Sequence, residues 1–184
     1  MEKIKVGDKS FHLFIKNADI MAAVDGVAGR INADFRDSAE PPVLLVVTNG
    51  AMVFAAHLFP RLDFDFEVMS IKLSSYSGTS STGSVKTTLP LSGDVKGRRV
   101  IVVEDIVDTG TTIEKIREIL DEGGAADVKI CTLMFKPSVY GKTYSYPLKP
   151  LEYVAMEVEN RFVVGFGLDY NELGRKYPDI YELD

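Results

Sequence analysis

The chain has 184 residues, of which 46% are hydrophobic and 26% are charged. This length is enough to bury the core of one domain, and the composition excludes extensive disorder. The formal net charge of −6, with lysine and arginine scattered along the chain, argues against a nucleic-acid-binding protein, because such proteins present a basic face.

Two further features concern the environment of the chain. Cys131 is the only cysteine, so no intrachain disulfide can form, as is typical of a reducing compartment. The longest apolar stretch, residues 51–56, is too short to cross a bilayer, and the N-terminus lacks the apolar segment of a signal peptide. We therefore expect a soluble, cytoplasmic protein in which Cys131 is a buried core residue.

The first predicted element is a helix that begins near Asp19, a residue type that favours helix starts. Its apolar residues recur with helical spacing: Ile20, Val24, Val27, Ala28, Ile31 and Phe35. The continuous apolar run 43–47 predicts a strand that is covered on both faces. Thr48, Asn49 and Gly50 then turn the chain into a short helix.

The second half of the chain alternates strands and helices in the same way. Strands are predicted at 66–71, 99–103, 128–135 and 162–165, and a helix precedes Gly123 and Gly124. This alternation indicates an α/β fold with a doubly wound, mainly parallel sheet in a single domain, residues 1–184. Ligands of such folds bind beyond the carboxyl ends of the strands.

The segment 100–112, VIVVEDIVDTGTT, carries the most specific chemistry of the sequence. Glu104 and Asp105 follow four β-branched residues, and a loop of small residues then opens a helix. The free backbone N–H groups of residues 109–112, the helix dipole and Gly110 together predict an anion site.

This loop differs from the common nucleotide-binding loops. It lacks the Gly-Lys-Ser/Thr of a Walker A loop, and the chain contains no G-x-G-x-x-G. Acidic residues beside a monophosphate site favour a ligand such as ribose 5-phosphate. The alternative is that Glu104 and Asp105 are solvated residues at a strand end and that Asp108 only caps a helix.

The pattern 100–112 closely resembles the phosphoribosyl-pyrophosphate loop of type I phosphoribosyltransferases, in the form of the hypoxanthine-guanine branch. The resemblance implies that Glu104 and Asp105 hold the ribose hydroxyls. It implies that the loop binds the 5′-phosphate, through Asp108, Thr109, Gly110, Thr111 and Thr112. It also implies that Asp108 lies against N7 of a purine as the general base.

Two other segments resemble the pyrophosphate side of that family's site. Asn49 and Gly50 match its pyrophosphate loop, in which a strained peptide bond is often found, although many members have lysine where Asn49 stands. The small-residue segment 74–84 is similar to the mobile catalytic loop, with Ser75 and Tyr76 closing over pyrophosphate. Arg175 matches a residue that contacts pyrophosphate.

The remaining matches concern the base and the metal. Lys136 would donate to the exocyclic oxygen of the purine, which favours a 6-oxopurine. The segment 161–172 is similar to the family's hood, with Arg161, Phe162 and Val163 as base-binding residues and Asp169 as a metal ligand beside Glu104 and Asp105. The hood is expected to combine the N-terminal segment with residues from about 150 to 184.

The resemblance implies a Mg²⁺-dependent enzyme of purine salvage. It would transfer the phosphoribosyl group of 5-phosphoribosyl 1-pyrophosphate to hypoxanthine or guanine, giving IMP or GMP and pyrophosphate. A xanthine-preferring transferase and a regulator that senses phosphoribosyl pyrophosphate are the alternatives. Mg²⁺ is expected to arrive with the substrate, neither nucleic acid nor membrane is expected as a partner, and family members are commonly homodimers or homotetramers.

Overall fold

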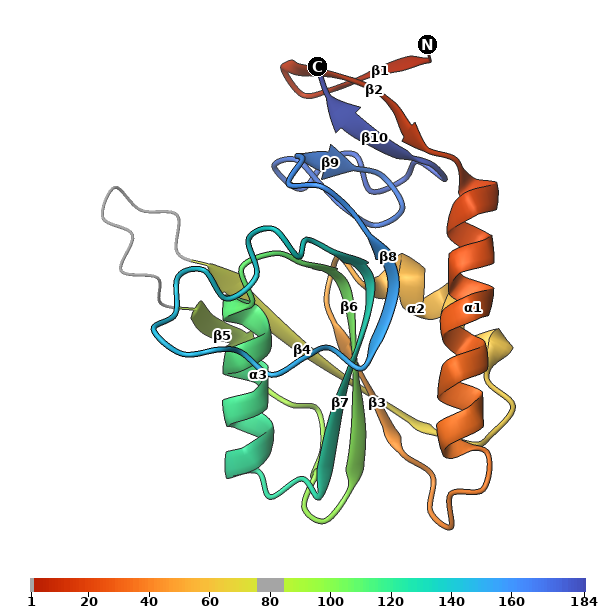
Figure 1. Ribbon diagram of the computed structural model, residues 1–184, viewed down its shortest axis with the longest axis vertical. Coiled ribbons are helices and arrows are strands. Elements are labelled where there is room, and N and C mark those ends of the chain that lie inside the picture. Colours follow the sequence, from red (N-terminus) through yellow and green to blue (C-terminus); the bar gives the residue numbers. More distant parts are fainter. Residues whose placement is uncertain (1, 76–84) are drawn as a thin grey trace.

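The computed structural model describes residues 2–75 and 85–184. These residues form a large sheet with the strand order β5-β4-β3-β6-β7-β8 and a small sheet with the order β1-β2-β10-β9 (Figure 1). The strands of the large sheet are β3 (Val43–Val47), β4 (Glu67–Ser75), β5 (Val85–Leu89), β6 (Arg99–Val107), β7 (Asp127–Phe135) and β8 (Tyr153–Glu157). The small sheet consists of β1 (Lys3–Val6), β2 (Lys9–Ile15), β9 (Val163–Val164) and β10 (Ile180–Leu183).

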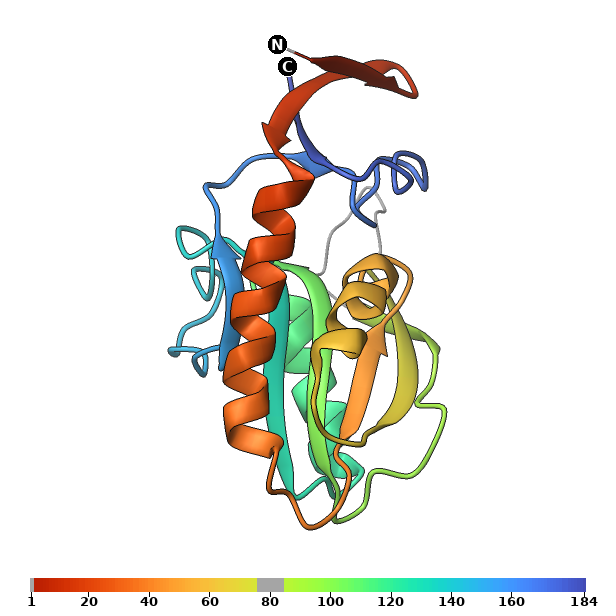
Figure 2. The ribbon, with the colours of Figure 1, turned by 90° about the vertical axis from the view of Figure 1, so that its right-hand side faces the viewer.

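The large sheet is parallel except for its edge strand β5, and helices cover both of its faces. Alternate residues of β3 show why: Leu44 and Val46 pack with α1 (Asn17–Phe35) and α2 (Met52–Leu58), whereas Leu45 packs with α3 (Thr111–Glu122). Figure 2 shows α1 and α2 on one side of the sheet and α3 on the other. The predicted α/β architecture is confirmed.

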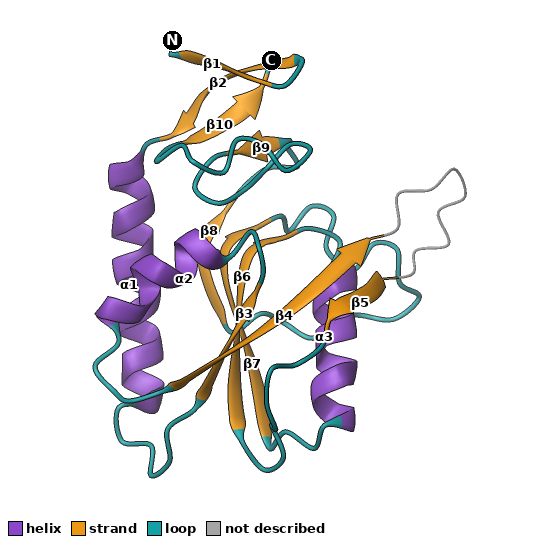
Figure 3. Ribbon diagram, turned by 180° about the vertical axis from the view of Figure 1, so that it is seen from behind, coloured by secondary structure: helices purple, strands orange, loops and turns teal. Residues whose placement is uncertain are grey.

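The small sheet is built from both ends of the chain. β2 and β10 pair antiparallel, and the two termini lie close together above the large sheet (Figures 1 and 3). We call this small sheet with the loops between residues 159 and 183 the hood. The predicted hood began near residue 150, but β8 pairs with β7 in the large sheet, so residues 153–157 do not belong to the hood.

Three predicted boundaries are corrected by tertiary contacts. Helix α1 begins at Asn17 rather than near Asp19, because the carboxylate of Asp179 accepts the backbone N–H of Asn17 at 2.7 Å. Strand β6 continues to Val107 because its last residues still pair with β7. Strand β9 is only Val163–Val164, shorter than the predicted strand 162–165.

The predicted loop 74–84 is also corrected at its start, since residues 74 and 75 belong to β4 and pair with β5. Tyr76 and the rest of that predicted lid, up to Ser84, lie outside the described residues. Cys131 is fully buried, as predicted, and burial raises the pKa of its thiol. No helix within residues 2–75 and 85–184 combines the length and hydropathy that a membrane span requires.

Candidate active site

A cavity of about 370 Å³ lies at the carboxyl ends of β3, β4 and β6, on the side of the large sheet that faces the hood. Most of the predicted ribose and pyrophosphate residues meet here. The cavity is lined by Asn49, Gly50, Glu104, Asp105, Thr112, Asp169 and Arg175 together with Val47, Thr48, Lys72, Leu73, Ile106 and Glu172. Segments that are more than 120 residues apart in the sequence, from Asn49 to Arg175, therefore line one site.

The two neighbouring acids of β6 are held at this cavity in different ways. Glu104 is only 5% exposed, and its Oε2 atom has no hydrogen-bond partner among the described residues. Asp105 is partly buried, and its Oδ1 atom accepts the N–H of Ile106 at 2.7 Å. An unpartnered carboxylate oxygen beside a second carboxylate suits a hydroxyl donor or a cation.

Burial and proximity both act on the protonation of this pair. Removal from water raises the pKa of Glu104 well above its ordinary value, and the adjacent charge of Asp105 raises it further. Burial also raises the pKa of Asp105, against the lowering effect of its hydrogen bonds and of the charge of Arg175. The pair therefore favours a ligand that supplies protons or positive charge.

Gly50 allows the loop after β3 to lie against Asp105. A Cβ atom at residue 50 would be 1.7 Å from Oδ2 of Asp105, so any side chain there would displace the carboxylate. The loop also contains a cis peptide bond, but between Thr48 and Asn49, and the expected position at Asn49–Gly50 was wrong by one residue. Loop 48–50 and β6 thus form two adjoining walls of the cavity.

The predicted phosphate loop is the turn from β6 to α3. Gly110 precedes the helix with a φ of 92°, a left-handed conformation that favours glycine. The hydroxyls of Thr109 and Thr111 lie 3.0 Å apart, and residues 106–113 with Glu104 line a smaller cavity of about 70 Å³. A small cavity at the first turn of a helix suits one phosphate group.

Lys136 and Asp108 form an ion pair that the sequence did not predict. The Nζ atom of Lys136 donates to Oδ2 of Asp108 at 3.0 Å and to Oδ1 of Asn160 at 3.4 Å. Lys136 is only 6% exposed, whereas the side chain of Asp108 is 48% exposed. A buried ammonium and an accessible carboxylate therefore lie side by side next to the phosphate turn.

The hood supplies an aromatic surface. Phe162 is 47% exposed, and its ring contacts Tyr170 edge-on with centroids 5.9 Å apart. Val163 is buried in β9. Arg161 pairs with the carboxylates of Glu159 and Glu182, so its charge is already neutralised within the hood.

Arg175 connects the acidic residues of the hood loop. Its guanidinium pairs with Asp169 at 2.7 Å and with Glu172 at 2.7 Å, and it donates to the carbonyl of Gly167. The hydrogen bond from Arg175 and its positive charge lower the pKa of Glu172. Asp169 also accepts the backbone N–H of Glu172 at 2.8 Å, so both of its oxygens have partners.

These residues fit a divalent cation only in part. Within residues 2–75 and 85–184, no group of three or more aspartate, glutamate, histidine or cysteine side chains is arranged to hold a metal ion. The unpartnered Oε2 of Glu104 is nevertheless the kind of hard oxygen ligand that Mg²⁺ prefers. This arrangement suits a cation that enters with much of its coordination supplied by the substrate.

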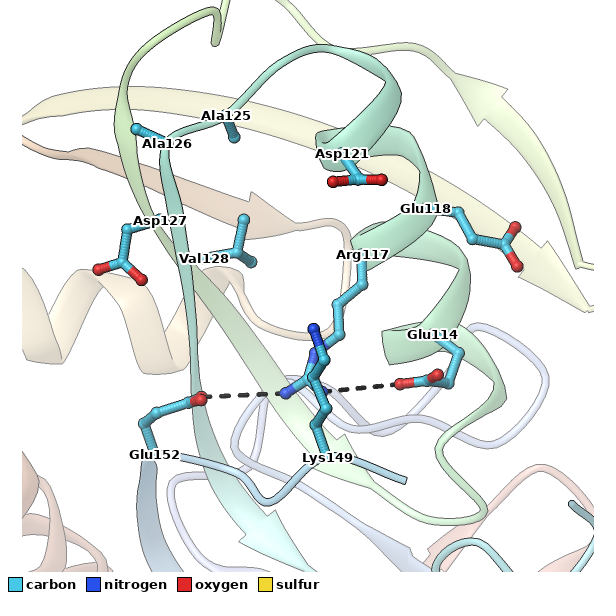
Figure 4. A pocket seen from close by; sticks show the side chains of 10 residues that line it. All are labelled: Glu114, Arg117, Glu118, Asp121, Ala125, Ala126, Asp127, Val128, Lys149 and Glu152. Carbon is cyan, nitrogen blue, oxygen red and sulfur yellow. Dashed lines mark ion pairs between the residues drawn. The ribbon is translucent and has the colours of Figure 1, made fainter. Parts of the chain in front are cut away.

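A larger cavity, about 470 Å³, lies between α3, β7 and residues 149–152 (Figure 4). Five carboxylates and two cations line it: Glu114, Glu118, Asp121, Asp127 and Glu152 against Arg117 and Lys149. None of the predicted site residues lines it, and its residues 125–128 lie at the amino end of β7, whereas ligands of such folds bind at the carboxyl ends of the strands. The cavity between β6 and the hood is therefore the candidate active site.

Three residues at this site were missed by the sequence reasoning: Lys72, Asn160 and Glu172. Lys72 lines the cavity from β4. Like Lys136, it lies near the carboxyl end of a strand of the parallel sheet, and this position was the available signal. Nothing in the sequence pattern distinguished Asn160 from an ordinary loop residue.

Comparison with known proteins agrees with the fold. Residues 15–171 match the family model of the phosphoribosyl transferase domain. The chain therefore belongs to the phosphoribosyl transferase family, and its fold is the type I phosphoribosyltransferase fold.

The names of individual relatives are more specific than the name of the family. The chain is 36% identical over 162 residues to the hypoxanthine-guanine-xanthine phosphoribosyltransferase of Tritrichomonas foetus, covering 88% of this chain and 85% of that protein. It is 35% identical over 169 residues to the hypoxanthine phosphoribosyltransferase of Escherichia coli K12, covering 91% and 92%. The structure of the Trypanosoma cruzi hypoxanthine phosphoribosyltransferase in complex with IMP matches with a TM-score of 0.83 at 28% identity, covering 100% and 98%.

Proposed function

We propose that the protein is a hypoxanthine or hypoxanthine-guanine phosphoribosyltransferase of purine salvage. It transfers the phosphoribosyl group of 5-phosphoribosyl 1-pyrophosphate to a 6-oxopurine, giving IMP or GMP and pyrophosphate. Of the two relatives that match about nine-tenths of the chain, one is named for hypoxanthine and the other for hypoxanthine, guanine and xanthine. The observation that carries the base specificity is the pair of Lys136 and Asp108, whose polar atoms lie 3.0 Å apart.

The pair matches two adjacent groups of a 6-oxopurine. An ammonium can only donate, so Lys136 suits the O6 atom of hypoxanthine or guanine and not the amino group of adenine. A carboxylate accepts, so Asp108 suits the N7 proton that the base loses as its N9 atom attacks the ribose. Because Lys136 and Asp108 contact each other directly, one base can engage both.

The other residues would position the sugar and its phosphates. Glu104 and Asp105 orient the ribose hydroxyls, and the N–H groups and hydroxyls of residues 109–112 hold the 5′-phosphate. The loop at Asn49 and Gly50 and the guanidinium of Arg175 line the same cavity and would bind the diphosphate. Phe162 supports the base by stacking, worth about 1–3 kcal/mol per base.

We further propose that the enzyme requires Mg²⁺. Glu104, Asp105 and Asp169 are the residues that would contact it, directly or through water. Bound Mg²⁺ offsets the negative charge that develops on the leaving pyrophosphate. Asp169 would share its carboxylate between the metal and its present partners, Arg175 and the N–H of Glu172, since each carboxylate oxygen can accept more than one partner.

The test is product formation from 5-phosphoribosyl 1-pyrophosphate with hypoxanthine, guanine, xanthine and adenine in separate reactions. Each reaction is run with Mg²⁺ and with a chelator, and the nucleotides are separated by chromatography. IMP or GMP should form only with Mg²⁺, and adenine should give no product. Activity on adenine alone, or on no purine, would refute the proposed function, and undiminished activity with the chelator would refute the metal requirement.

Xanthine is the second candidate substrate, because the T. foetus relative that is 36% identical is named for xanthine as well. The ion pair does not separate the three oxopurines, which differ at C2 and not at O6. The same panel of bases decides between them.

We also propose a homodimer or homotetramer, which light scattering after gel filtration would distinguish from a monomer.

A further inference from the structure

We propose that Leu148 and Tyr140 are positioning residues that hold the 5′-phosphate turn from outside the active site. This inference rests on the proposed function, because it assumes that the turn from β6 to α3 binds the 5′-phosphate. Neither residue lines the cavities at the carboxyl ends of the strands. Both lie in the segment that leaves β7 after Lys136 and returns to β8, which we call the buttress, residues 137–152.

The surroundings of Gly110 show how closely the buttress approaches the turn. A Cβ atom at residue 110 would lie 2.6 Å from Cδ1 of Leu148 and 2.8 Å from Cε2 of Tyr140. These two side chains are the nearest neighbours of Gly110 outside the adjoining chain. Leu148 also packs on Gly141, where a Cβ atom would be 3.5 Å from its Cγ. Leu148 therefore fills the space between the turn and the buttress.

Backbone hydrogen bonds join the same two segments. The N–H of Gly141 donates to the carbonyl of Thr109 at 3.0 Å, and the N–H of Lys136 donates to the carbonyl of Val107 at 2.9 Å. The Gly141 bond joins the turn to the buttress, and the Lys136 bond joins the residue before Asp108 to the residue after β7. The carbonyl of Thr109 thus accepts from the buttress, and the N–H groups in the first turn of α3, which have no acceptor within the helix, remain for a ligand.

Two contacts of Tyr140 hold the buttress in place. The ring of Tyr140 meets Phe135 edge-on with centroids 5.1 Å apart, and its hydroxyl donates to the carbonyl of Lys149 at 2.7 Å. Burial raises the pKa of Tyr140, so the hydroxyl stays protonated and remains a donor at neutral pH. These contacts close the loop of the buttress around Leu148.

The second anchor comes from α3. Arg117 extends between Glu114 and Glu152 (Figure 4), and its Nη2 atom donates to the carbonyl of Pro150 at 3.1 Å. Helix α3, which begins at the phosphate turn, therefore fixes the end of the buttress, and the buttress contacts the turn. The turn, helix α3 and the buttress are thus connected to one another by contacts. These contacts keep the N–H groups of residues 109–112 in one arrangement, which reduces the entropy lost when a phosphate binds.

The test is Leu148→Ala, with Leu148→Met as the conservative rescue. We expect the truncation to raise the KM for 5-phosphoribosyl 1-pyrophosphate about five- to tenfold, with kcat and the KM for hypoxanthine changed less than about twofold. Leu148→Met, which refills the space, should restore the KM to within about twofold of wild type. A truncation that lowers kcat or Tm but leaves this KM unchanged would overturn the proposal.

Leu151→Ala is the matched control, since Leu151 lies in the same segment and packs on the core beneath α3. It should lower Tm without raising the KM for 5-phosphoribosyl 1-pyrophosphate, and an equal rise in both variants would contradict a specific role of Leu148.

A second readout is independent of turnover. Amide hydrogen exchange at residues 109–112 should be faster in Leu148→Ala than in wild type, and unchanged exchange would also overturn the proposal. If the wild-type protein makes no nucleotide, the proposed function fails. The exchange rates then still test whether Leu148 holds the turn in place.

Discussion

Asp108 and Lys136 show at the scale of single residues how the sequence and the structure complement each other. Each was predicted to face the purine, on separate elements. The structure adds that they contact each other and that Asn160 contacts Lys136 as well. The ion pair places a charged donor next to a charged acceptor, an arrangement that would suit proton transfer from a bound base during its attack.

Asp108→Asn tests the proton-accepting role. The amide keeps the size of the side chain and one acceptor oxygen but cannot take a proton. We expect kcat to fall by about 10²–10⁴-fold, with the KM for hypoxanthine changed by less than about threefold. Steady-state kinetics with hypoxanthine as the varied substrate measure both values. Equal losses of kcat and of base affinity would contradict the role of general base.

Glu104 gives a prediction on pH and stability. Because burial and Asp105 raise its pKa in the folded state, the folded protein holds this proton at pH values where the unfolded chain has lost it. The stabilising effect is full below the ordinary glutamate pKa of about 4.3 and is lost as the pH rises toward the raised pKa. The free energy of unfolding should therefore fall as the pH rises above that ordinary value of about 4.3 and approaches the raised pKa.

Urea denaturation of wild type and Glu104→Gln across that range measures the effect. The variant cannot ionise at this position, so its free energy of unfolding should decline less steeply with pH than that of wild type. The comparison is made without substrate or metal, since either would alter the charge of the pair. Parallel curves for the two proteins would show that Glu104 does not have a raised pKa.

At the scale of elements, the loop after β3 depends on the absence of one side chain. Gly50→Ala would place a Cβ atom 1.7 Å from the carboxylate of Asp105, so the loop or the carboxylate must move. We expect kcat/KM for 5-phosphoribosyl 1-pyrophosphate to fall by about 10²-fold or more, since displacements of about 1 Å have such effects. Initial rates at varied concentrations of this substrate test the prediction.

Gly26→Ala is the matched control for that substitution. Gly26 lies in α1, and nothing lies within 4 Å of the position of its Cβ atom. Alanine is favoured over glycine inside a helix by about 0.5–1 kcal/mol, so this variant should be slightly more stable and fully active. If both glycine variants retain wild-type activity, the close approach of Gly50 and Asp105 is not required.

Element boundaries were predictable where local signals decide them. The apolar run of β3 and the glycines that end α3 were placed correctly. The start of α1 was not, because the acceptor for the first N–H is Asp179, which is 162 residues away. Likewise, the length of β6 depends on its pairing with β7 and not on its own composition.

Asp179 connects the hood to the start of α1, and this contact yields a stability prediction. Asp179→Ala removes the acceptor of the Asn17 N–H, and losing such a cap costs about 0.5–2 kcal/mol. Asp19→Ala is the control, since Asp19 lies within the first turn of α1, where a carboxylate interacts favourably with the helix dipole. Thermal unfolding should show the larger loss for Asp179→Ala, and the reverse order would contradict the observed start of the helix.

At the scale of the whole molecule, the site lies between a parallel sheet and a hood made from both chain ends. The carboxyl ends of the parallel strands supply Glu104, Asp105 and Lys136, and the hood supplies Phe162 and Asp169. The sequence predicted most of these residues because each follows a strand or lies in a family motif. The pairing of Lys136 with Asp108, and the contact of Leu148 with the turn at Gly110, depend on distances between segments that no local pattern contains.

The central claim is that the paired Lys136 and Asp108 make this protein a 6-oxopurine phosphoribosyltransferase. The most direct measurement is the ratio of kcat/KM for hypoxanthine to that for adenine, in wild type and in Lys136→Met. A site built around a donor to O6 should favour hypoxanthine by about 10³-fold or more, and loss of the ammonium should reduce that ratio by at least about tenfold. A wild-type ratio near one, or a ratio that Lys136→Met leaves unchanged, would contradict the account.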